Sequence, residues 1–434
     1  MLKRIRILNY KSLKDTEVKL QPLTVLFGPN SVGKSNFLDA LQLLSRLVNT
    51  RTLKDAFEPP YRGTPLESFT FGNEGITGLL KRDSVSFSLE VDVELSPQTV
   101  KAVNNQISEM KSFRRPEEAS SKPPASVRER YLRYRVEIEI SPKKGFLRVA
   151  DEYLAALNVN GEVSNKRKPF LELMEHRFHL RMEGQAHPTY LERYLDHTIL
   201  SLPHYPPYYP HLVALKQELA SWFVFYFEPR ERMRATSPVK EVNHIGLMGE
   251  DLAAYLNTLR AQHEPQFRAV EKSLHTIIPS ISGLEVEVNN LGEVELRIKE
   301  GDTPIPARLL SEGTLRVLGL LSLEGVKERP SLIGLEEPEN GVHPRRLNLI
   351  AKYLKTRAET GNTQFIVTTH SPLLPDLIPD QFLYACKRTE GSTIIERFTP
   401  ELGSFTRATD IDNSLNEEAP STVSERILRG DFDA

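Results

Sequence analysis

The chain has 434 residues, of which 39% are hydrophobic and 26% charged, as expected for a folded globular protein of one large domain or two to three ordinary ones. Its formal net charge of −2 excludes a global attraction to nucleic acid or anionic lipid, so such binding must rest on local patches. The single cysteine, Cys386, excludes an internal disulfide, and no apolar run approaches the roughly 20 residues of a membrane span. We expect a cytoplasmic α/β protein without a signal peptide or membrane partner.

The first 48 residues predict strands, a loop and a helix in succession. The alternation in RIRILNY (4–10) is typical of a half-buried strand, and TEVKL (16–20) predicts a second short strand. PLTVLFG (22–28) is apolar on both faces, as a central buried strand should be. FLDALQLLSRLV (37–48) follows with leucines at helical spacing.

The middle of the chain is less regular. Two segments with period-two alternation, 84–95 and 131–140, predict antiparallel sheet, and the polar stretch 112–126 between them predicts a loop. Residues 202–212 carry too many prolines for a helix or a central strand, so we expect a loop there, followed by a buried strand in 221–230.

From residue 249 the patterns become clear again. Two amphipathic helical stretches fill 249–278, and 284–298 predicts a hairpin with NNLG near its turn. An α/β alternation follows, with the predicted elements helix 311–327, strand 332–336, helix 344–360, strand 364–369 and strand 381–387.

The stretch GPNSVGKS, between the predicted strand 22–28 and helix 37–48, matches the pattern G-x-x-x-x-G-K-S/T. Its backbone N–H groups and the helix N-terminus can converge on phosphate oxygens. Lys34 is expected to reach the β- and γ-phosphates, and the Ser35 hydroxyl to ligate Mg²⁺. The predicted binding residues are Gly28, Asn30, Ser31, Val32, Gly33, Lys34 and Ser35. The motif predicts a nucleoside triphosphate and leaves the reaction open.

Glu336 and Glu337 end the apolar run SLIGLEEP, where neighbouring carboxylates repel each other unless a cation lies beside them. On their own they would indicate a solvent-exposed strand end. Together with the phosphate loop, Glu336 is expected to hold the metal opposite Ser35, directly or through water. Glu337 then faces the γ-phosphate, where it can orient and polarise a water for in-line attack.

Two further segments are candidates for phosphate contacts. His370 ends the apolar run FIVTTH; a lone histidine there is more often structural, but in this sheet we expect it to hydrogen-bond the γ-phosphate. Ser311, Glu312 and Gly313 stand at a predicted helix start, where a serine cap, a glycine and free N–H groups form a second anion site. Because the first site already holds the phosphates, we expect this turn to close on the γ-phosphate of a partner's nucleotide.

At these residues the chain resembles ABC-type ATPases of the RecF/SMC/OLD (overcoming lysogenization defect) kind. ILNYKSLKD is similar to that group's N-terminal strand and turn, and GPNSVGKSN to its Walker A loop with the trailing Asn36. LLSEGTLR is similar to a divergent signature motif, LIGLEEPENGVHP to a Walker B motif with its D-loop, and TTHSP to the switch-histidine segment.

The resemblance implies an α/β ABC-ATPase head of the P-loop NTPase type, with a mixed central sheet, an antiparallel β subdomain and an inserted α/β lid region. It implies a homodimer, with two ATP molecules between Walker A of one subunit and the signature of the other. It also implies that Lys11 approaches the phosphates and that ATP and Mg²⁺ are the cofactors.

Three departures from the family pattern stand out. The signature reads SEGT where transporter-type ATPases have SGGQ, which leaves the phosphate contact of Glu312 open. Walker B has Glu336 where aspartate is commoner, so the metal contact can run through water. The insertion lacks the heptads of an SMC arm and is similar instead to the compact insertions of Septu or retron-associated defence ATPases.

Full OLD proteins carry a Toprim nuclease after the ATPase. After His370 we recognise no nuclease constellation. We expect 382–398 to be a closing hairpin of the ATPase sheet and 413–434 a terminal helix or tail. An effector nuclease is therefore expected on another chain.

Weaker signals concern nucleic acid and zinc. Three basic clusters could contact a nucleic-acid backbone, although solvated sheet faces look the same. They are Arg128, Arg130, Arg133 and Arg135 with Tyr131 and Tyr134; Lys166, Arg167 and Lys168; and Arg230, Arg232 and Arg234. A zinc site is disfavoured, because the histidines of the insertion lack acid or cysteine partners at metal spacing. These histidines are His176, His179, His187, His197, His204 and His211.

The predicted organisation is lobe I with Walker A (1–84), antiparallel strands and insertion (85–240), lobe II with the signature, Walker B and switch histidine (241–400), and a C-terminal tail (401–434). We predict an ATPase that dimerises around ATP and controls an effector nuclease in anti-phage defence. A RecF-like DNA-repair ATPase and a regulatory module that binds ATP without hydrolysing it are the alternatives. SEGT and the NYKSLKD turn disfavour an ABC transporter subunit.

Overall fold

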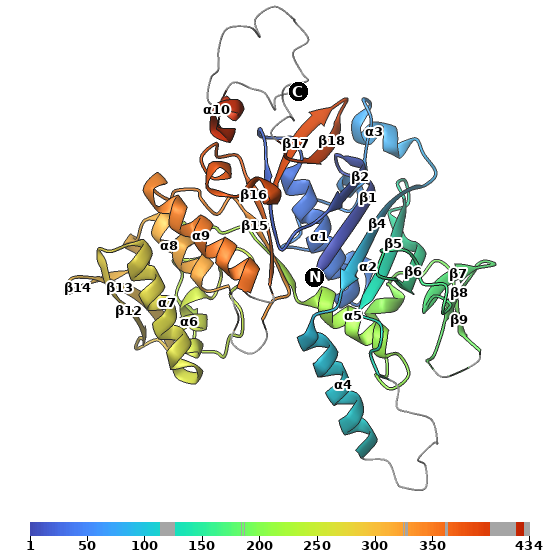
Figure 1. Ribbon diagram of the computed structural model, residues 1–434, viewed down its shortest axis with the longest axis horizontal. Coiled ribbons are helices and arrows are strands. Elements are labelled where there is room, and N and C mark those ends of the chain that lie inside the picture. Colours follow the sequence, from blue (N-terminus) through green and yellow to red (C-terminus); the bar gives the residue numbers. More distant parts are fainter. Residues whose placement is uncertain are drawn as a thin grey trace, which may run out of the picture. The chain divides into compact units, whose positions relative to one another are not determined.

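The structure is a computed structural model that describes residues 1–112, 126–183, 185, 187–323, 325, 329–360, 363–399 and 422–428 (Figure 1). The chain forms two compact units. Unit 1 comprises residues 1–21, 36–222 and 388–395, and unit 2 comprises 22–35, 223–387 and 396–434 so far as these are described. Each is considered by itself below. The division into four parts made from the sequence stays a prediction.

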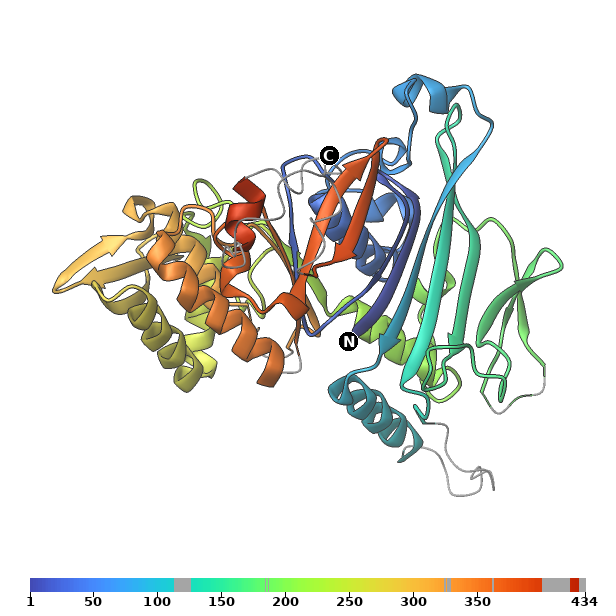
Figure 2. The same ribbon diagram turned by 45° about the horizontal axis from the view of Figure 1, so that its top comes forward.

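Unit 1 is built on an eight-stranded antiparallel sheet with the order β2-β1-β4-β5-β6-β7-β8-β9. Figure 2 shows its long strands side by side. The strands are β1 (Leu2–Tyr10), β2 (Leu13–Lys19), β4 (Val85–Glu94), β5 (Tyr131–Ser141), β6 (Phe146–Ala156), β7 (Leu171–Met174), β8 (Arg177–Leu180) and β9 (Thr189–Glu192). In β5 every second residue is buried, which confirms the alternation expected for 131–140.

The helices of unit 1 are less well predicted by the sequence. They are most of α1 (Lys34–Asn49), then α2 (Leu53–Ala56), α3 (Gly75–Leu80), α4 (Pro97–Ser112) and α5 (Pro210–Ala220). The expectation of a loop through 212 is wrong at its end, because Pro210 occupies the first turn of α5, where proline is tolerated. The expected loop 112–126 lies mostly outside the described residues.

Unit 2 contains the parallel strands predicted to carry the site. They belong to a six-stranded sheet with the order β10-β15-β16-β3-β17-β18. The strands are β3 (Leu23–Phe27), β10 (Trp222–Phe225), β15 (Leu332–Glu336), β16 (Gln364–Thr369), β17 (Leu383–Thr389) and β18 (Ser392–Arg397); all of β3, β15 and β16 and most of β10 and β17 belong to unit 2, and most of β18 belongs to unit 1. β3 and β16 are buried throughout, and β3 pairs in parallel with β16 and β17, as does β15 with β16. The predicted strands 332–336 and 364–369 and the closing hairpin are confirmed.

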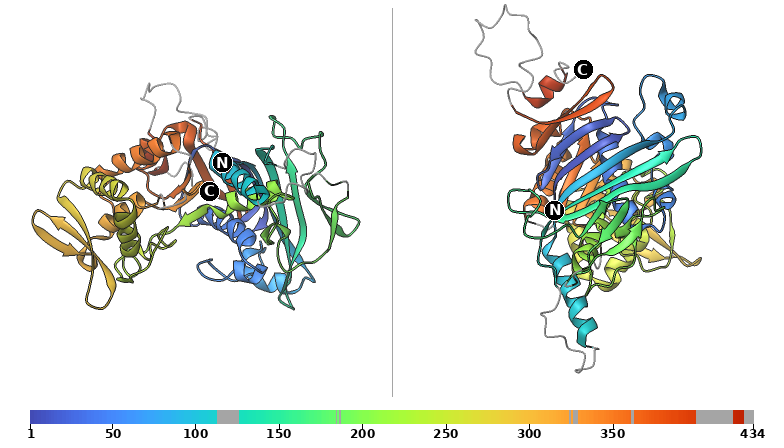
Figure 3. Two further views of the ribbon diagram at one scale, coloured as in Figure 1. Left: turned by 90° about the horizontal axis from the view of Figure 1, so that it is seen from below. Right: turned by 90° about the vertical axis from the view of Figure 1, so that its right-hand side faces the viewer.

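Two helices and a second layer complete unit 2. α8 (Glu312–Leu321) ends earlier than the predicted 311–327, because Ser322 and Leu323 form a turn, while α9 (Pro344–Thr360) matches its prediction. The second layer consists of α6 (Leu252–Gln262), α7 (Glu264–Ile277) and a hairpin of β12 (Ile281–Val288) and β13 (Glu293–Glu300). The two helices pack against the hairpin (Figure 3). This is the hairpin expected for 284–298. β11 (Ser237–Pro238) and β14 (Thr303–Pro306) flank β13.

The core of unit 2 joins these layers through residues such as Phe267 on α7, Leu315 on α8, Ile350 on α9 and Val367 on β16. Of the predicted tail, the structure describes α10 (Val423–Leu428). Among the described residues, no helix is both long and apolar enough to cross a membrane.

Candidate active site

The parallel register brings the predicted site residues to one edge of the sheet. Glu336 at the end of β15 pairs with Thr368, and Phe27 at the end of β3 pairs with Thr369 of β16. The residues that follow each strand therefore start from the same level. They are the phosphate loop after β3, Glu337 after β15 and His370 after β16.

The phosphate loop needs glycine at its first position. Gly28 has a φ of +150°, and a Cβ there would lie 2.4 Å from the carbonyl oxygen of Cys386. Gly33, with a φ of +103°, and Ser31, with a φ of +65°, also lie in the left-handed region. Asn30 and Ser31 are exposed and Val32 is buried, so the loop presents polar side chains and backbone outward.

Lys34 turns back over this loop. Its Nζ donates to the carbonyl oxygens of Gly28 at 2.7 Å and Pro29 at 2.6 Å. Burial lowers the pKa of Lys34, and nearby acidic groups oppose that shift. The structure gives this ammonium only neutral hydrogen-bond acceptors among the described residues. A buried cation with no ion pair suits an anionic ligand, so the loop fits a phosphate group.

Ser35 and Glu336 supply the oxygens for a metal. The Ser35 hydroxyl donates to Oε1 of Glu336, which joins the start of α1 to the end of β15. No group of three His, Cys, Asp or Glu residues that could hold a metal occurs among the described residues. That finding bears on a zinc site but not on Mg²⁺, which binds one or two carboxylates together with substrate phosphates and water. A hydroxyl beside a carboxylate fits such an ion.

Glu337 is held by two neighbours. Its Oε1 lies 2.6 Å from Nδ1 of His370, and its Oε2 accepts from the Asn340 side-chain amide at 2.6 Å. The backbone at Glu337 has a φ of +47°, and its N–H donates to the Thr368 carbonyl oxygen at 2.9 Å. The structure thus brings together two predicted catalytic residues, and adds Asn340, which the sequence reasoning missed.

Glu339 is a second residue that the sequence reasoning missed. It is 5% exposed, and Thr369 donates its hydroxyl to Oε1 of Glu339. The Thr369 hydroxyl oxygen in turn accepts from the Ser371 N–H at 2.9 Å, so Glu339 supports the turn that carries His370. Burial raises the pKa of Glu339, and its Oε2 has no hydrogen-bond partner among the described residues. Its only sequence signal is the repeated acid in EEPEN.

The SEGT turn is also part of unit 2. The Ser311 hydroxyl caps α8 by accepting from the Thr314 N–H at 3.2 Å. A Cβ at Gly313 would lie 2.1 Å from the Gly341 carbonyl oxygen, so α8 starts in tight contact with the turn after Glu337. Oε1 of Glu312 accepts from Nε of Arg230 at 2.6 Å.

Lys11 and Asn36 belong to unit 1. The Lys11 ammonium lies 2.7 Å from Oδ2 of Asp39 and donates to the Arg62 carbonyl oxygen at 3.2 Å. The Asn36 side-chain amide donates to the Ser12 hydroxyl at 2.7 Å. Their predicted nucleotide contacts stay predictions.

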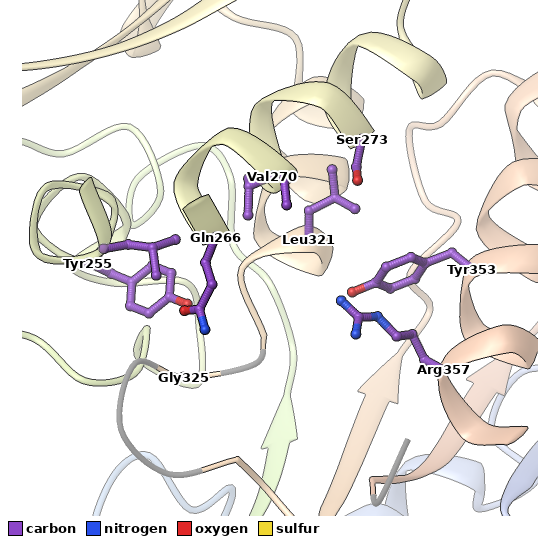
Figure 4. A pocket seen from close by; sticks show the side chains of 10 residues that line it. Tyr255, Gln266, Val270, Ser273, Leu321, Gly325, Tyr353 and Arg357 are labelled. Carbon is purple, nitrogen blue, oxygen red and sulfur yellow. The ribbon is translucent and has the colours of Figure 1, made fainter. Parts of the chain in front are cut away.

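A pocket of unit 2 that the sequence did not predict lies among α6, α7, α8 and α9. Figure 4 shows Gln266 and Val270 facing it from α7, and Tyr353 and Arg357 from α9. Its volume of about 70 Å³ is that of a few waters, so it cannot hold a nucleotide.

Some residues of the predicted weak sites make contacts within unit 1. His211 is fully buried; its Nε2 accepts from the N–H groups of Arg128 and Glu129, and its Nδ1 bonds Glu183. Of the first basic cluster, Arg133 pairs with Asp92 at 2.6 Å and Arg135 with Asp151 at 2.7 Å. Asp92 is buried, so Arg133 is engaged within the sheet, and the nucleic-acid contact of this cluster stays a prediction.

Known proteins resemble this chain at several levels. Over 407 residues it is 21% identical to the OLD nuclease of Thermus scotoductus, with 92% of this chain covered. The chain spans 65% of the length of that relative. Its fold is similar to that of an SmcHead in a crystal structure with the C-winged helix domain of ScpA, with a TM-score of 0.54 and 11% sequence identity. The match covers 92% of this chain and 98% of the SmcHead chain. That likeness shows an SMC-type ABC-ATPase head fold.

A family model also matches residues 23–376, which is most of the chain. The chain therefore belongs to the AAA domain family described as "putative AbiEii toxin, Type IV TA system".

Proposed function

We propose that this chain is an ABC-type ATPase subunit of the OLD-like kind that binds and hydrolyses ATP. The observation that carries the proposal is the meeting of Ser35 with Glu336, and of His370 with Glu337, at the carboxyl ends of neighbouring parallel strands. Ligands bind at this edge of open α/β sheets. The buried Lys34 beside them is suited to a phosphate.

In the proposed reaction each side chain has one task. Lys34 and the loop N–H groups bind the triphosphate, and Ser35 and Glu336 would hold Mg²⁺. When bound, the ion neutralises charge on the phosphates and on the paired glutamates. Glu337 orients a water and accepts its proton, and Asn340 and His370 hold the carboxylate in place for that purpose. With Nδ1 engaged by Glu337, Nε2 of His370 is the ring nitrogen left for a phosphate oxygen.

The proposed active assembly is a homodimer in which the SEGT turn of one copy closes on the nucleotide of the other. Two features support it. The turn ends in the N-terminus of α8, which favours anions, and Leu309 beside it is 69% exposed. Gly313 packs on Gly341, which links the SEGT turn to the segment that follows Glu337. A movement of the turn on dimerisation would therefore shift that segment.

We propose a role in anti-phage defence, in which the ATPase controls a partner effector that is a nuclease. The family description names a toxin, and the curated relative is named a nuclease.

Unit 1 has a groove of about 690 Å³, lined by Arg4, Asp92, Tyr131 and Arg133 among others. Because its arginines are paired with acids, we do not assign the groove to nucleic acid.

The test is phosphate release from ATP and Mg²⁺ by the wild type and by Glu337→Gln, with Glu359→Gln, an exposed position on α9, as the control. Glu337→Gln should bind ATP yet lose hydrolysis by about 100-fold or more, since the general base is gone. Equal phosphate release by all three proteins would favour the module that binds ATP without turnover. Co-purification of the untagged native complex then identifies the effector, and recombination partners in place of a nuclease would favour the repair ATPase.

A further inference from the structure

Residues 227–234, here called the arginine strap, are fastened to α8. A Cβ at Gly319 of α8 would lie 2.7 Å from Cε of Met233 and 3.1 Å from Cζ of Phe227. Both side chains are buried, and they anchor the two ends of the strap. Glycine at 319 is what permits this close approach. The arginines between and beyond these anchors are therefore presented from a fixed backbone.

One arginine contacts the carboxylate of Glu312 at the start of α8, and the charges of two more act on it. Arg230 donates to it through Nε at 2.6 Å, and this hydrogen bond is the largest of the causes that lower the pKa of Glu312. The charges of Arg316 and Arg234 lower it further. Arg234 also donates to the Leu310 carbonyl oxygen at 2.7 Å, which fixes the residue before Ser311. Three guanidinium groups therefore act on the Glu312 carboxylate, while the charge of Arg316 is also met by Glu337 and Glu339.

The guanidinium groups of these arginines have features suited to a phosphate. The Nε atoms of Arg234 and Arg316 are buried and have no hydrogen-bond partner among the described residues. The Arg230 side chain, by contrast, is 78% exposed. An exposed ion pair contributes little to stability, so Arg230 can exchange the carboxylate for a phosphate at small cost. Its planar fork of donors matches phosphate oxygens better than a lysine ammonium does.

We propose that Arg230 is a catalytic residue that acts in trans, contacting the γ-phosphate of the nucleotide bound by a second copy of this chain. Glu312 is then a positioning residue, which keeps Arg230 at the SEGT turn until the copies engage. This role also explains an acid in the signature, because its charge is met by arginines and not by the phosphate. The inference rests on the proposed function and adds a residue to it.

The first experiment compares Arg230→Ala and Arg230→Lys with Arg232→Ala in ATP hydrolysis. Arg232 is a matched control, since it lies on the same strap and pairs with Glu228 at the surface. Arg230→Ala should lower kcat by about 100-fold with KM little changed, as for loss of one donor to developing charge. Arg230→Lys should recover only part of the rate, and Arg232→Ala should keep it. A wild-type kcat in Arg230→Ala overturns the inference.

The second experiment tests action in trans. Arg230→Ala and Glu337→Gln chains carrying different tags are co-expressed, and the mixed dimer is purified through both tags. One of its two sites then has Glu337 in cis and Arg230 in trans, so about half of the wild-type rate should return, as symmetry requires. A mixed dimer no faster than either parent places Arg230 in cis or in a structural role and overturns the inference. Absence of hydrolysis by the wild type would instead overturn the proposed function, and the inference with it.

Discussion

The Nδ1 atom of His370 lies 2.6 Å from Oε1 of Glu337, so the residue that follows β16 is hydrogen-bonded to the residue that follows β15. Asn340 holds the other oxygen of that carboxylate. Glu337 also adopts a φ of +47°, which few non-glycine residues do. Strained backbone that the surroundings hold in place is common at functional sites.

Asn340 should matter for turnover more than for binding. Asn340→Ala frees one oxygen of Glu337, so we expect kcat to fall about 10-fold while KM for ATP stays nearly constant, as for a lost positioning contact. Asn340→Asp sets a second carboxylate against the first, so the repulsion between them should lower kcat at least as much as Asn340→Ala does. Steady-state rates of ATP hydrolysis by the wild type and the two variants measure both effects. Unaltered rates in both variants would contradict a positioning role for the hydrogen bond between Asn340 and Glu337.

Gly313 should be required for stability as well as for the signature turn. In Gly313→Ala the new Cβ would lie 2.1 Å from the Gly341 carbonyl oxygen, so backbone must shift. We expect the free energy of unfolding to fall by about 1–3 kcal/mol, as in overpacked sites. Gly72→Ala is the control, because a Cβ there meets nothing within 4 Å, and it should change stability by less than about 0.5 kcal/mol. Urea denaturation compares the two, and equal midpoints would disprove the close contact.

Glu152 should make unit 1 sensitive to pH. Burial raises the pKa of its carboxyl from 4.5 to about 7, against three hydrogen bonds that oppose the shift, from Tyr134, Ile199 and Leu200. Between these values the folded state binds more protons than the unfolded state, so stability falls as pH rises from about 4.5 to about 7 and then levels.

The size of this effect follows from the shift. Raising the pKa from 4.5 to about 7 corresponds to a loss of roughly 3 kcal/mol at most in the free energy of unfolding, at about 1.36 kcal/mol per pH unit. Urea unfolding at several pH values should show that slope in the wild type and a flatter one in Glu152→Gln. Parallel slopes in the two proteins would show that Glu152 stays ionised when folded.

Cys386 should be unreactive in the folded protein. It is fully buried behind the phosphate loop, and burial raises the pKa of its thiol from 9.0 to about 12, so thiolate is scarce at neutral pH. A thiol reagent should modify it only at the rate of unfolding, and stoichiometrically in denaturant. Rapid modification of the native protein would mean that the segment around Gly28 opens readily.

The strands and helix that carry Glu336, Glu337 and His370 could be predicted closely from the sequence. Their apolar runs are short and bounded by charged residues and prolines, so periodicity and breakers agree. β6 escaped prediction because it is buried irregularly and its pairing with β5 shifts register between Glu137 and Ile138. α5 escaped because proline-rich sequence hides a helix that begins at a proline.

The residues of the candidate site also fall into those that the sequence predicts and those that it does not. Ser35 and Glu336 were predictable as a pair, because a loop motif and a strand end each have a known place in such a sheet. Asn340, Glu339 and Arg230 were not, since each depends on a turn or strap whose path is set by packing. Glu339 reaches Thr369 from another segment, and Arg230 reaches Glu312 across 82 positions of sequence.

The residue-by-residue pairing of β15, β16 and β3 restricts where insertions and deletions can occur in the sequence. Side chains alternate between the two faces of a strand, so gaining or losing a single amino acid inside β15 or β16 would turn the acid or histidine at its end away from the loop. Lengthening the connections between them leaves that phase intact. Variants with altered spacing should therefore be tolerated in the linkers and rejected within the strands.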